Sequence, residues 1–170
     1  MKRKDMKHKK NSSYKKTALG VVLALLVVLT ILLNLFTHVL AVVQYFGDGM
    51  EPALKNGQTL VLHRTDSVKA GDIIAFYYNN QLLVRRVICE GGKQIYINKD
   101  GTVEINEEPL DEPYLEKTSI GQCNITFPYK VTPEHYFVMG DNRTIAMDSR
   151  LKEIGTISAD RILGKVLFTI

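Results

Sequence analysis

The sequence has few residues of the kinds that commonly hold metals, with two cysteines and four histidines among 170 residues. A tetrahedral zinc site needs Cys or His ligands at short, recurring spacings, and Cys89, Cys123, His63 and His135 show no such spacing. The chain also lacks internal repeats, and it has no low-complexity tract after its first few residues. We therefore expect an ordered domain that uses no metal and no cofactor.

Acidic residues are nearly absent from the first 17 residues, where Asp5 is the only one. The same segment contains eight basic residues: Lys2, Arg3, Lys4, Lys7, Lys9, Lys10, Lys15 and Lys16. Its net charge of +7 leaves −3 for the rest of the chain, because the total is +4 at pH 7. The positive charge is thus a flanking segment and not a stripe on a folded surface, so we predict no nucleic-acid partner.

An apolar run from Ala18 to Phe36 follows the basic segment and is interrupted only by Gly20, Thr30 and Asn34. As a helix it would be about 28 Å long at about 1.5 Å per residue, which is close to the thickness of a bilayer's hydrocarbon core. Basic residues that flank such a span lie on the cytoplasmic side. The run therefore predicts a helix that crosses the lipid bilayer once.

This pattern predicts three parts: a basic cytoplasmic tail over residues 1–17, a transmembrane helix over residues 18–38, and an extracellular β domain over residues 39–170. The protein is then expected in the cell membrane with its N-terminus in the cytoplasm. A cleaved secretory signal is the alternative, with Val39-Leu40-Ala41 as the cleavage site. The apolar run exceeds the about 7 to 15 residues of a usual signal, which favours the uncleaved anchor.

Residues 39–170 show strand patterns almost throughout, as β-branched and aromatic stretches separated by Gly, Asn and Asp. Asp100-Gly101 between two alternating stretches is the strongest hairpin signal. Proline-rich residues 107–132 predict an extended flap, and residues 158–162 a short helix capped by Ser158. The expected strands cover residues 39–46, 59–64, 72–78, 82–88, 94–98, 102–105, 136–139 and 164–170. We therefore predict an all-β fold with coiled or barrel-like sheets.

Cys89 and Cys123 both lie in the predicted extracellular domain, a compartment that permits disulfides. A bridge would need the two Cα atoms within about 7 Å of each other, which a sequence cannot establish. The residues are therefore interpreted as two small packing residues or as a disulfide, with packing favoured.

Short motifs recur in a fixed order along this domain. Residues 47–54, Gly-Asp-Gly-Met-Glu-Pro-Ala-Leu, resemble the Gly-x-Ser-Met-x-Pro-Thr-Leu stretch of type I signal peptidases of Gram-positive bacteria. Residues 84–88, Val-Arg-Arg-Val-Ile, are similar to Val-Lys-Arg-Val-Ile, and residues 140–150 are similar to Gly-Asp-Asn-Arg-x-x-Ser-x-Asp-Ser-Arg. The resemblance runs from the apolar run to the C-terminus, and it implies a signal-peptidase-like coiled β-sheet domain with one N-terminal transmembrane helix.

The resemblance implies a Ser/Lys dyad, in which a neutral lysine takes the serine proton and the alkoxide attacks a peptide carbonyl. At the matching positions this chain has Gly49, which has no side chain, and Arg85, whose guanidinium stays protonated. Ala146 stands where the family serine orients the lysine. Because no catalytic group is intact, we predict a pseudo-peptidase that is not an enzyme, although residual peptidase activity is not excluded.

Two other sets of catalytic groups are less favoured. The family uses the position of Ser149 as scaffold beside Asp148, so a substitute nucleophile there is not the preferred interpretation. An aspartic-protease pair of Asp48 and Asp148 would have to share a proton, and the cations Arg85 and Arg150 would instead favour two ionised carboxylates.

The resemblance also implies structural ion pairs, Arg86 with Asp141 and Asp148 with Arg150. A cation at residue 85 needs a partner when buried, and we hypothesise an ion pair with Asp48. The alternative is that Asp48 faces solvent. We call Asp48, Gly49, Arg85 and Ala146 the degenerate dyad site. A peptide cleft that accepts an extended segment by strand addition is expected beside it, with three candidate residues: Met50, Pro52 and Val84.

The chain is also similar to the signal-peptidase-like accessory proteins encoded with sortase-assembled pili of Gram-positive bacteria. This similarity implies a membrane-anchored, catalytically inactive factor for pilus polymerisation, with pilin subunits and/or a class C sortase as partners. One alternative is a signal peptidase I-type serine endopeptidase whose different active site cleaves secretory precursors. Another is a protein that captures signal peptides or an active peptidase without any link to pili.

Overall fold

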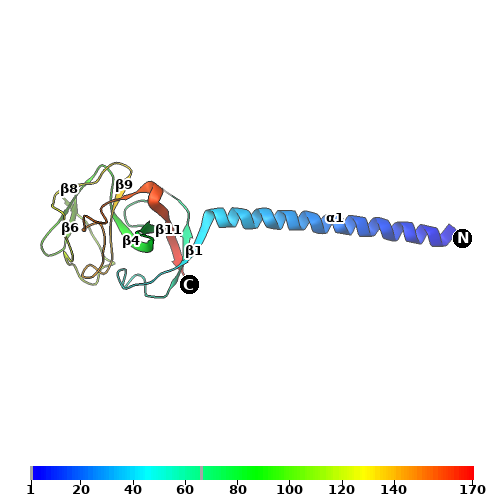
Figure 1. Ribbon diagram of the computed structural model, residues 1–170, viewed down its shortest axis with the longest axis horizontal. Helices are drawn as coiled ribbons and strands as arrows, with labels where there is room; N and C mark the ends of the chain where they lie inside the picture. Colours follow the sequence, from blue (N-terminus) through cyan, green and yellow to red (C-terminus); the bar gives the residue numbers. More distant parts are fainter. Residues whose placement is uncertain (1, 66) are drawn as a thin grey trace. The chain divides into compact units, whose positions relative to one another are not determined.

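The computed structural model describes residues 2–65 and 67–170, and it describes side-chain surroundings from residue 18 onward except at residues 35, 37 and 66. The chain divides into two compact units, Met1–Val39 and Leu40–Ile170 (Figure 1). Each unit is described below by itself.

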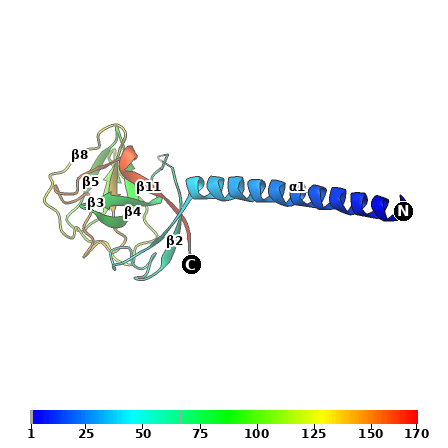
Figure 2. The ribbon, with the colours of Figure 1, turned by 45° about the vertical axis from the view of Figure 1, so that its right-hand side comes forward.

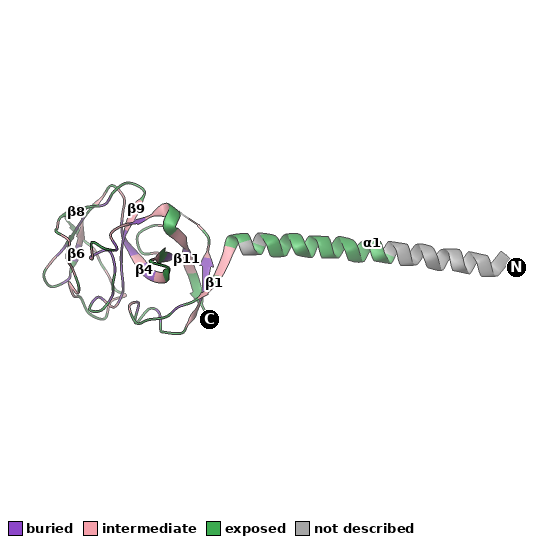
Figure 3. Cartoon of the chain, viewed as in Figure 1, coloured by how far each residue is buried: buried purple, intermediate pink, exposed green. Residues whose placement is uncertain are grey.

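The first unit is the helix α1 (Lys2–Val39), drawn in blue to cyan in Figure 1. Its first part is the predicted basic tail, and the side chains of residues 1–17 lie outside the described residues. Every residue from Ala18 to Asn34 is exposed, as the green colour in Figure 3 shows. The span predicted over residues 18–38 is not shown, since no helix within the described residues is both long enough and apolar enough for a bilayer crossing.

The second unit contains two antiparallel sheets. The larger sheet has the order β1-β2-β11-β3-β4-β9-β10. Its strands are β1 (Leu40–Gln44), β2 (Thr59–His63), β3 (Ile73–Tyr78), β4 (Gln81–Glu90), β9 (His135–Met139), β10 (Ile157–Ser158) and β11 (Ile162–Thr169). The smaller sheet has the order β7-β6-β5-β8. Its strands are β5 (Gln94–Ile97), β6 (Val103–Ile105), β7 (Glu108–Pro109) and β8 (Tyr129–Lys130).

Figure 2 shows the smaller sheet, with β5 and β8, at the opposite end of this unit from β2. Register shifts interrupt β4 between Val87 and Cys89, and β11 between Val166 and Phe168. Such irregularities bend and twist a strand, which explains how a sheet of seven strands becomes coiled. The predicted all-β class is confirmed at the level of a mostly-β fold of the signal-peptidase kind, the kind that the solved structure described below also has.

The turns agree with the local sequence. Asn79 and Asn80, with φ of 46° and 62°, connect β3 to β4 as the left-handed residues of a two-residue turn. Gly101, with φ of 90°, follows Asp100 between β5 and β6, where an added Cβ would also lie 2.3 Å from Ser119 N. The short helix is a 3-10 turn, Ala159–Arg161, and the Ser158 side chain makes no capping hydrogen bond to it.

Three apolar clusters fill the second unit. One lies between the two sheets and includes Cys89, Ile95 and Phe137, with side chains of the proline-rich flap packed against it. A second surrounds the segment after β1, and a third lies around Ile74, Phe76 and Val138. Cys89 and Cys123 are both free thiols, so the structure contains the packing alternative and no bridge between them.

Candidate functional site

The segment that follows β1 is anchored from inside the core. Tyr45 is buried, and its hydroxyl oxygen accepts a hydrogen bond from the Met50 N–H at 3.1 Å. The Gly49 carbonyl accepts a hydrogen bond from the Asn142 N–H, also at 3.1 Å. Residue 49 is therefore held between the exit of β1 and the loop that follows β9.

Arg85 lies in β4 with only 6% of its surface exposed, and its guanidinium faces Gly49. Its Nε donates to the Met147 carbonyl at 2.9 Å, and its Nη1 donates to the Val84 carbonyl at 2.6 Å. A Cβ added at residue 49 would lie 3.3 Å from Nη2. The arginine thus lies against the only side of residue 49 from which a side chain would project.

Burial lowers the pKa of Arg85, whereas the Asp148 carboxylate and the Tyr45 hydroxyl raise it. An arginine nevertheless stays protonated in proteins, so residue 85 is a buried cation and not a base. Burial also raises the pKa of the Tyr45 hydroxyl, which the nearby Met50 N–H and Arg85 oppose. Neither group is suited to accept a proton from a substrate near neutral pH.

Ala146 lies beside the same position. The Ala146 N–H donates to the Asn142 carbonyl at 3.1 Å. A Cβ added at Gly140 would lie 2.3 Å from the Ala146 Cβ. The same added Cβ would lie 2.4 Å from the Gly49 carbonyl oxygen. Residues 49, 85 and 146 of the degenerate dyad site are therefore brought together by the fold, whereas its fourth residue, Asp48, is exposed.

Three buried ion pairs surround this site. Arg86 binds Asp141 with two hydrogen bonds, at 2.8 Å and 2.5 Å, and its guanidinium lies 3.9 Å from the centre of the Tyr114 ring. Arg150 binds Asp148 in the same two-bond manner, at 2.8 Å and 2.7 Å. Both pairs are those that the sequence implied.

The third ion pair was missed by sequence reasoning. Arg143, which is 1% exposed, binds Glu112 of the flap at 2.5 Å and 3.1 Å, and Glu112 also accepts the Tyr114 hydroxyl. Burial and the Glu112 carboxylate together raise the pKa of Tyr114. The Glu112-Pro113-Tyr114 sequence was the available signal, because an acidic residue in a proline-rich flap needs a cation when the flap packs down.

The hypothesised pair of Asp48 and Arg85 is not formed. Both residues belong to the described part of the chain, and no ion pair within 4 Å joins them there. Asp48 is exposed, and Arg85 instead binds two main-chain carbonyls. The physical reason is that carbonyl oxygens inside the fold reach the guanidinium, while the residue 48 side chain faces water.

Two of the three expected cleft residues do not line an open surface. Met50 and Val84 are fully buried and belong to one apolar cluster with Tyr45 and Leu54. Only Pro52 is exposed. Besides Pro52, the large apolar side chains that reach solvent on the segment after β1 and on the loop after β9 include Phe46, Ile145 and Met147, with exposed fractions of 70%, 50% and 50%.

Ser149 and Asp148 both act in the scaffold. The Ser149 hydroxyl accepts the Val138 N–H at 3.0 Å, and Asp148 accepts the Gly140 N–H at 3.0 Å. Each side chain is at least 99% buried. Because Asp148 is also paired with Arg150 while Asp48 is exposed, the two carboxylates do not form a proton-sharing pair.

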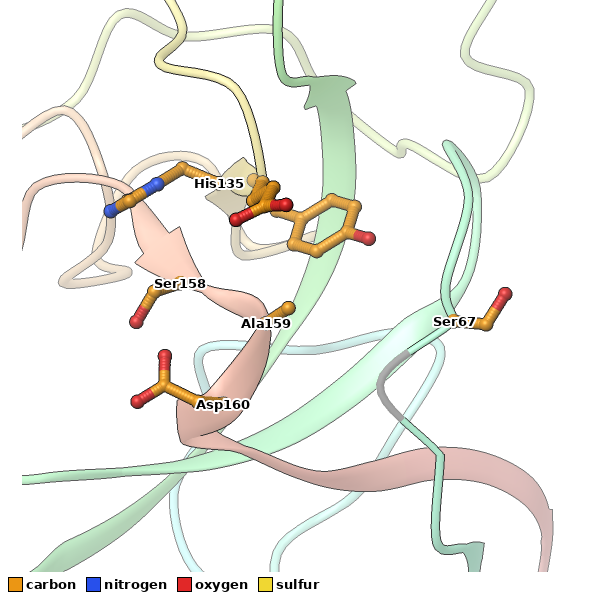
Figure 4. A pocket seen from close by; sticks show the side chains of 7 residues that line it. Ser67, His135, Ser158, Ala159 and Asp160 are labelled. Carbon is orange, nitrogen blue, oxygen red and sulfur yellow. The ribbon is translucent and has the colours of Figure 1, made fainter.

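A separate pocket of about 580 Å³ lies over β9, β10 and the 3-10 turn (Figure 4). Ser158 and His135 are cross-strand partners there, and the His135 Nδ1 lies 3.1 Å from the Pro133 carbonyl oxygen. No side-chain hydrogen bond joins Ser158 to His135 within the described residues, and the Ser67 side chain points away from both in Figure 4. Among the described residues, no three or more His, Cys, Asp or Glu side chains are grouped so that they could hold a metal ion.

Comparisons with known proteins find one family over nearly the whole chain. A family model described as signal peptidase, peptidase S26, matches residues 16–170. Signal peptidase I T of Bacillus subtilis is 34% identical over 173 residues, covering 94% of this chain and 86% of that protein. Signal peptidase IB of Staphylococcus aureus is 34% identical over 142 residues, covering 72% of this chain and 73% of that protein.

A solved structure is similar as well. The crystal structure of a signal peptidase I from Enterococcus faecalis V583 matches with a TM-score of 0.50 and 30% sequence identity. It covers 60% of this chain and 97% of its own.

The prediction of a pseudo-peptidase that is not an enzyme is wrong by these comparisons. Relatives that are 34% identical are named signal peptidase I, and so is the solved structure. The prediction inferred the inactivity of the whole protein from the side chains at only three positions, 49, 85 and 146. The missing hydroxyl at Gly49 excludes residue 49 as a nucleophile, but it does not exclude other groups of the protein from that role.

Proposed function

The chain belongs to the signal peptidase family, peptidase S26, and we propose that it binds an extended polypeptide beside Gly49 and Arg85. The observation that carries this proposal is the set of three ion pairs that fixes the loop after β9, whose Asn142 N–H donates to the Gly49 carbonyl. A site fixed in advance loses little conformational entropy on binding. More of the free energy of its contacts with the bound chain therefore contributes to affinity.

The surface of the site suits such a ligand. Phe46 on one segment and Ile145 and Met147 on the other are apolar and at least half exposed. Extended chains are commonly bound through main-chain hydrogen bonds together with shallow apolar contacts to alternate side chains. Ile145 and Met147 flank Ala146 in the loop after β9, where the N–H groups of Ile145 and Ala146 both donate to the Asn142 carbonyl in a turn.

We further propose that this binding serves the polymerisation of sortase-dependent pili, as an accessory or chaperone-like step. Pilin subunits and/or a class C sortase are the proposed partners. The support is the resemblance of the chain as a whole to signal-peptidase-like pilus accessory proteins, together with the residues found at positions 49, 85 and 146.

The proposed location is the cell membrane, with a single pass, a cytoplasmic N-terminus and an extracellular second unit. The support is the charge pattern of the sequence, in which eight basic residues and one acidic residue precede the apolar run. Cysteine-reactive labelling tests it in intact cells. A Cys89→Ala, Cys123→Ala protein with a new cysteine at exposed Lys117 should react with an impermeant maleimide, and labelling only after lysis would refute the topology.

Deletion and complementation test the role in pilus assembly. Loss of the gene should abolish the SDS-resistant ladder of pilin polymers, and the wild-type chain should restore it. Met147→Asp should fail to restore the ladder, because it places a charge on the proposed apolar contact surface. Tyr77→Asp, at a residue of β3 that is 54% exposed, is the matched control and should restore it. An intact ladder in the deletion strain would refute the pilus proposal.

Cleavage of secretory precursors is the second candidate function, and it is favoured by the names of the relatives. Since residue 49 has no hydroxyl, such cleavage would require another nucleophile. Mass spectrometry of a precursor incubated with the full-length protein identifies the cut bond. Absence of any defined cut, with a precursor that a signal peptidase I processes in parallel, would dismiss this candidate.

A further inference from the structure

The buried charges around residue 49 do not balance. Four arginines surround the site, and three of them have carboxylate partners: Arg86 has Asp141, Arg143 has Glu112 and Arg150 has Asp148. Arg85 is the fourth, and no carboxylate lies within 4 Å of it in the described part of the chain. The site therefore holds one buried cation that no carboxylate of the described residues contacts directly.

The hydrogen bonds of Arg85 leave one nitrogen available. Nε and Nη1 donate to the carbonyls of Met147 and Val84, whereas Nη2 has no partner among the described residues. No fully buried side-chain nitrogen or oxygen in that part of the chain lacks a partner, so Nη2 must reach the surface. It is also the guanidinium atom nearest to the side from which a side chain at Gly49 would project.

A buried guanidinium favours an anion over a neutral ligand for two reasons. An unpaired cation in a region of low dielectric constant is costly, and an anion that reaches it recovers part of that cost. A hydrogen bond from an arginine to a carboxylate is also roughly twice as strong as one between neutral groups. The other three arginines around the site are already paired with carboxylates in this way.

We propose that Arg85 Nη2 binds a carboxylate group of the extended polypeptide that occupies the site, and this proposal rests on the proposed function above. Gly49 provides the room, because the Cβ of any larger residue would lie 3.3 Å from Nη2, closer than an ordinary van der Waals contact. The exposed apolar side chains of Ile145 and Met147 would contact the residues that precede the carboxylate. A terminal carboxylate and an acidic side chain share this chemistry, and the test separates them.

Three fluorescent peptides built on one sequence of small apolar residues provide the test, with full-length protein in detergent, and only the third differs from that sequence, at one residue. The first ends in a free carboxylate, the second ends in an amide, and the third ends in an amide and contains one internal glutamate. Fluorescence anisotropy gives the dissociation constant of each. We expect about tenfold tighter binding of the first or the third than of the second, and the better of the two identifies the source of the carboxylate.

Substitution of the arginine then assigns the effect. Arg85→Met should reduce the preference for a carboxylate, measured as the ratio of the dissociation constants of the amide and carboxylate peptides, to less than twofold. Arg85→Lys keeps a cation and should keep a preference of a few fold, which matters if the Met variant fails to fold by circular dichroism. Arg64→Met removes an exposed arginine of equal charge and should keep the full preference.

Equal affinities of all three peptides for the wild-type chain would overturn the carboxylate proposal while leaving polypeptide binding intact. A preference that survives unchanged in folded Arg85→Met protein would overturn it as well. Failure of every peptide to bind would instead overturn the proposed function, and the carboxylate proposal with it.

Discussion

At the scale of single residues, the site is explained by space as much as by chemistry. A guanidinium is larger than an ammonium group, and it lies where the residue 49 side chain would otherwise project. Glycine at position 49 and arginine at position 85 therefore fit each other. The sequence identified both positions, but it placed the counter-charge wrongly because hydrogen bonds to main-chain carbonyls leave no pattern in a sequence.

This fit predicts that residues 49 and 85 are energetically coupled. Gly49→Ser should cost about 1 kcal/mol of unfolding free energy, because its Cβ would lie 3.3 Å from Arg85 Nη2 and its hydroxyl would extend farther. In an Arg85→Lys background the same change should cost less, with a coupling of about 0.5 to 1 kcal/mol. Urea unfolding followed by tyrosine fluorescence suits a chain without tryptophan. Strictly additive costs would show that the two residues do not compete for space.

Cys89 gives a prediction in the alkaline range. Burial raises the pKa of its thiol to about 11 from an ordinary value of 9.0. The neutral thiol is favoured in the folded state, so this contribution is fully present below pH 9 and is lost as the pH rises to 11. Relative to Cys89→Ala, the wild-type chain should lose about 2 to 3 kcal/mol of unfolding free energy over that range. Cys123→Ala serves as the control, and it should lose stability in parallel with the wild type.

At the scale of elements, the sequence predicts where the strands lie better than it predicts which of their residues are exposed. The periodicity of Thr59–His63 and Ile73–Tyr78 and the Asn-Asn and Asp-Gly turns are local properties, and the structure contains these elements. Met50 and Val84 are different. β4 pairs with β3 on one side and β9 on the other, and both Val84 and Arg85 are buried, so alternation cannot tell a core face from a cleft face.

The loop after β9 and the segment after β1 approach each other closely enough to make a sharp prediction. Gly140→Ala should cost about 3 kcal/mol or more, because its Cβ would lie 2.4 Å from the Gly49 carbonyl oxygen and 2.3 Å from the Ala146 Cβ. Gly49→Ala is the matched control and should cost less than about 1 kcal/mol, since it meets only the end of a long side chain. Urea unfolding measures both. Similar costs for the two variants would contradict this account of the loop contact.

At the scale of the whole molecule, the motifs were sufficient to identify the family but not to decide its activity. The family match begins at residue 16 and ends at residue 170, so it spans nearly the whole chain. Three substituted side chains are local facts, whereas activity depends on every group that can reach a bound substrate. The interpretation of residues 49, 85 and 146 as proof of an inactive protein extended beyond what those residues determine.

The central claim is that the surface beside Gly49 and Arg85 binds an extended polypeptide during pilus assembly, and photo-crosslinking in living cells tests it most directly. Benzoylphenylalanine would replace Met147 in one strain and Tyr77 in another, two residues that are 50% and 54% exposed. The account predicts that the residue 147 probe, and not the residue 77 probe, forms an adduct that contains a pilin or a class C sortase. Adducts from residue 77 alone, or from neither position in cells that assemble pili, would contradict it.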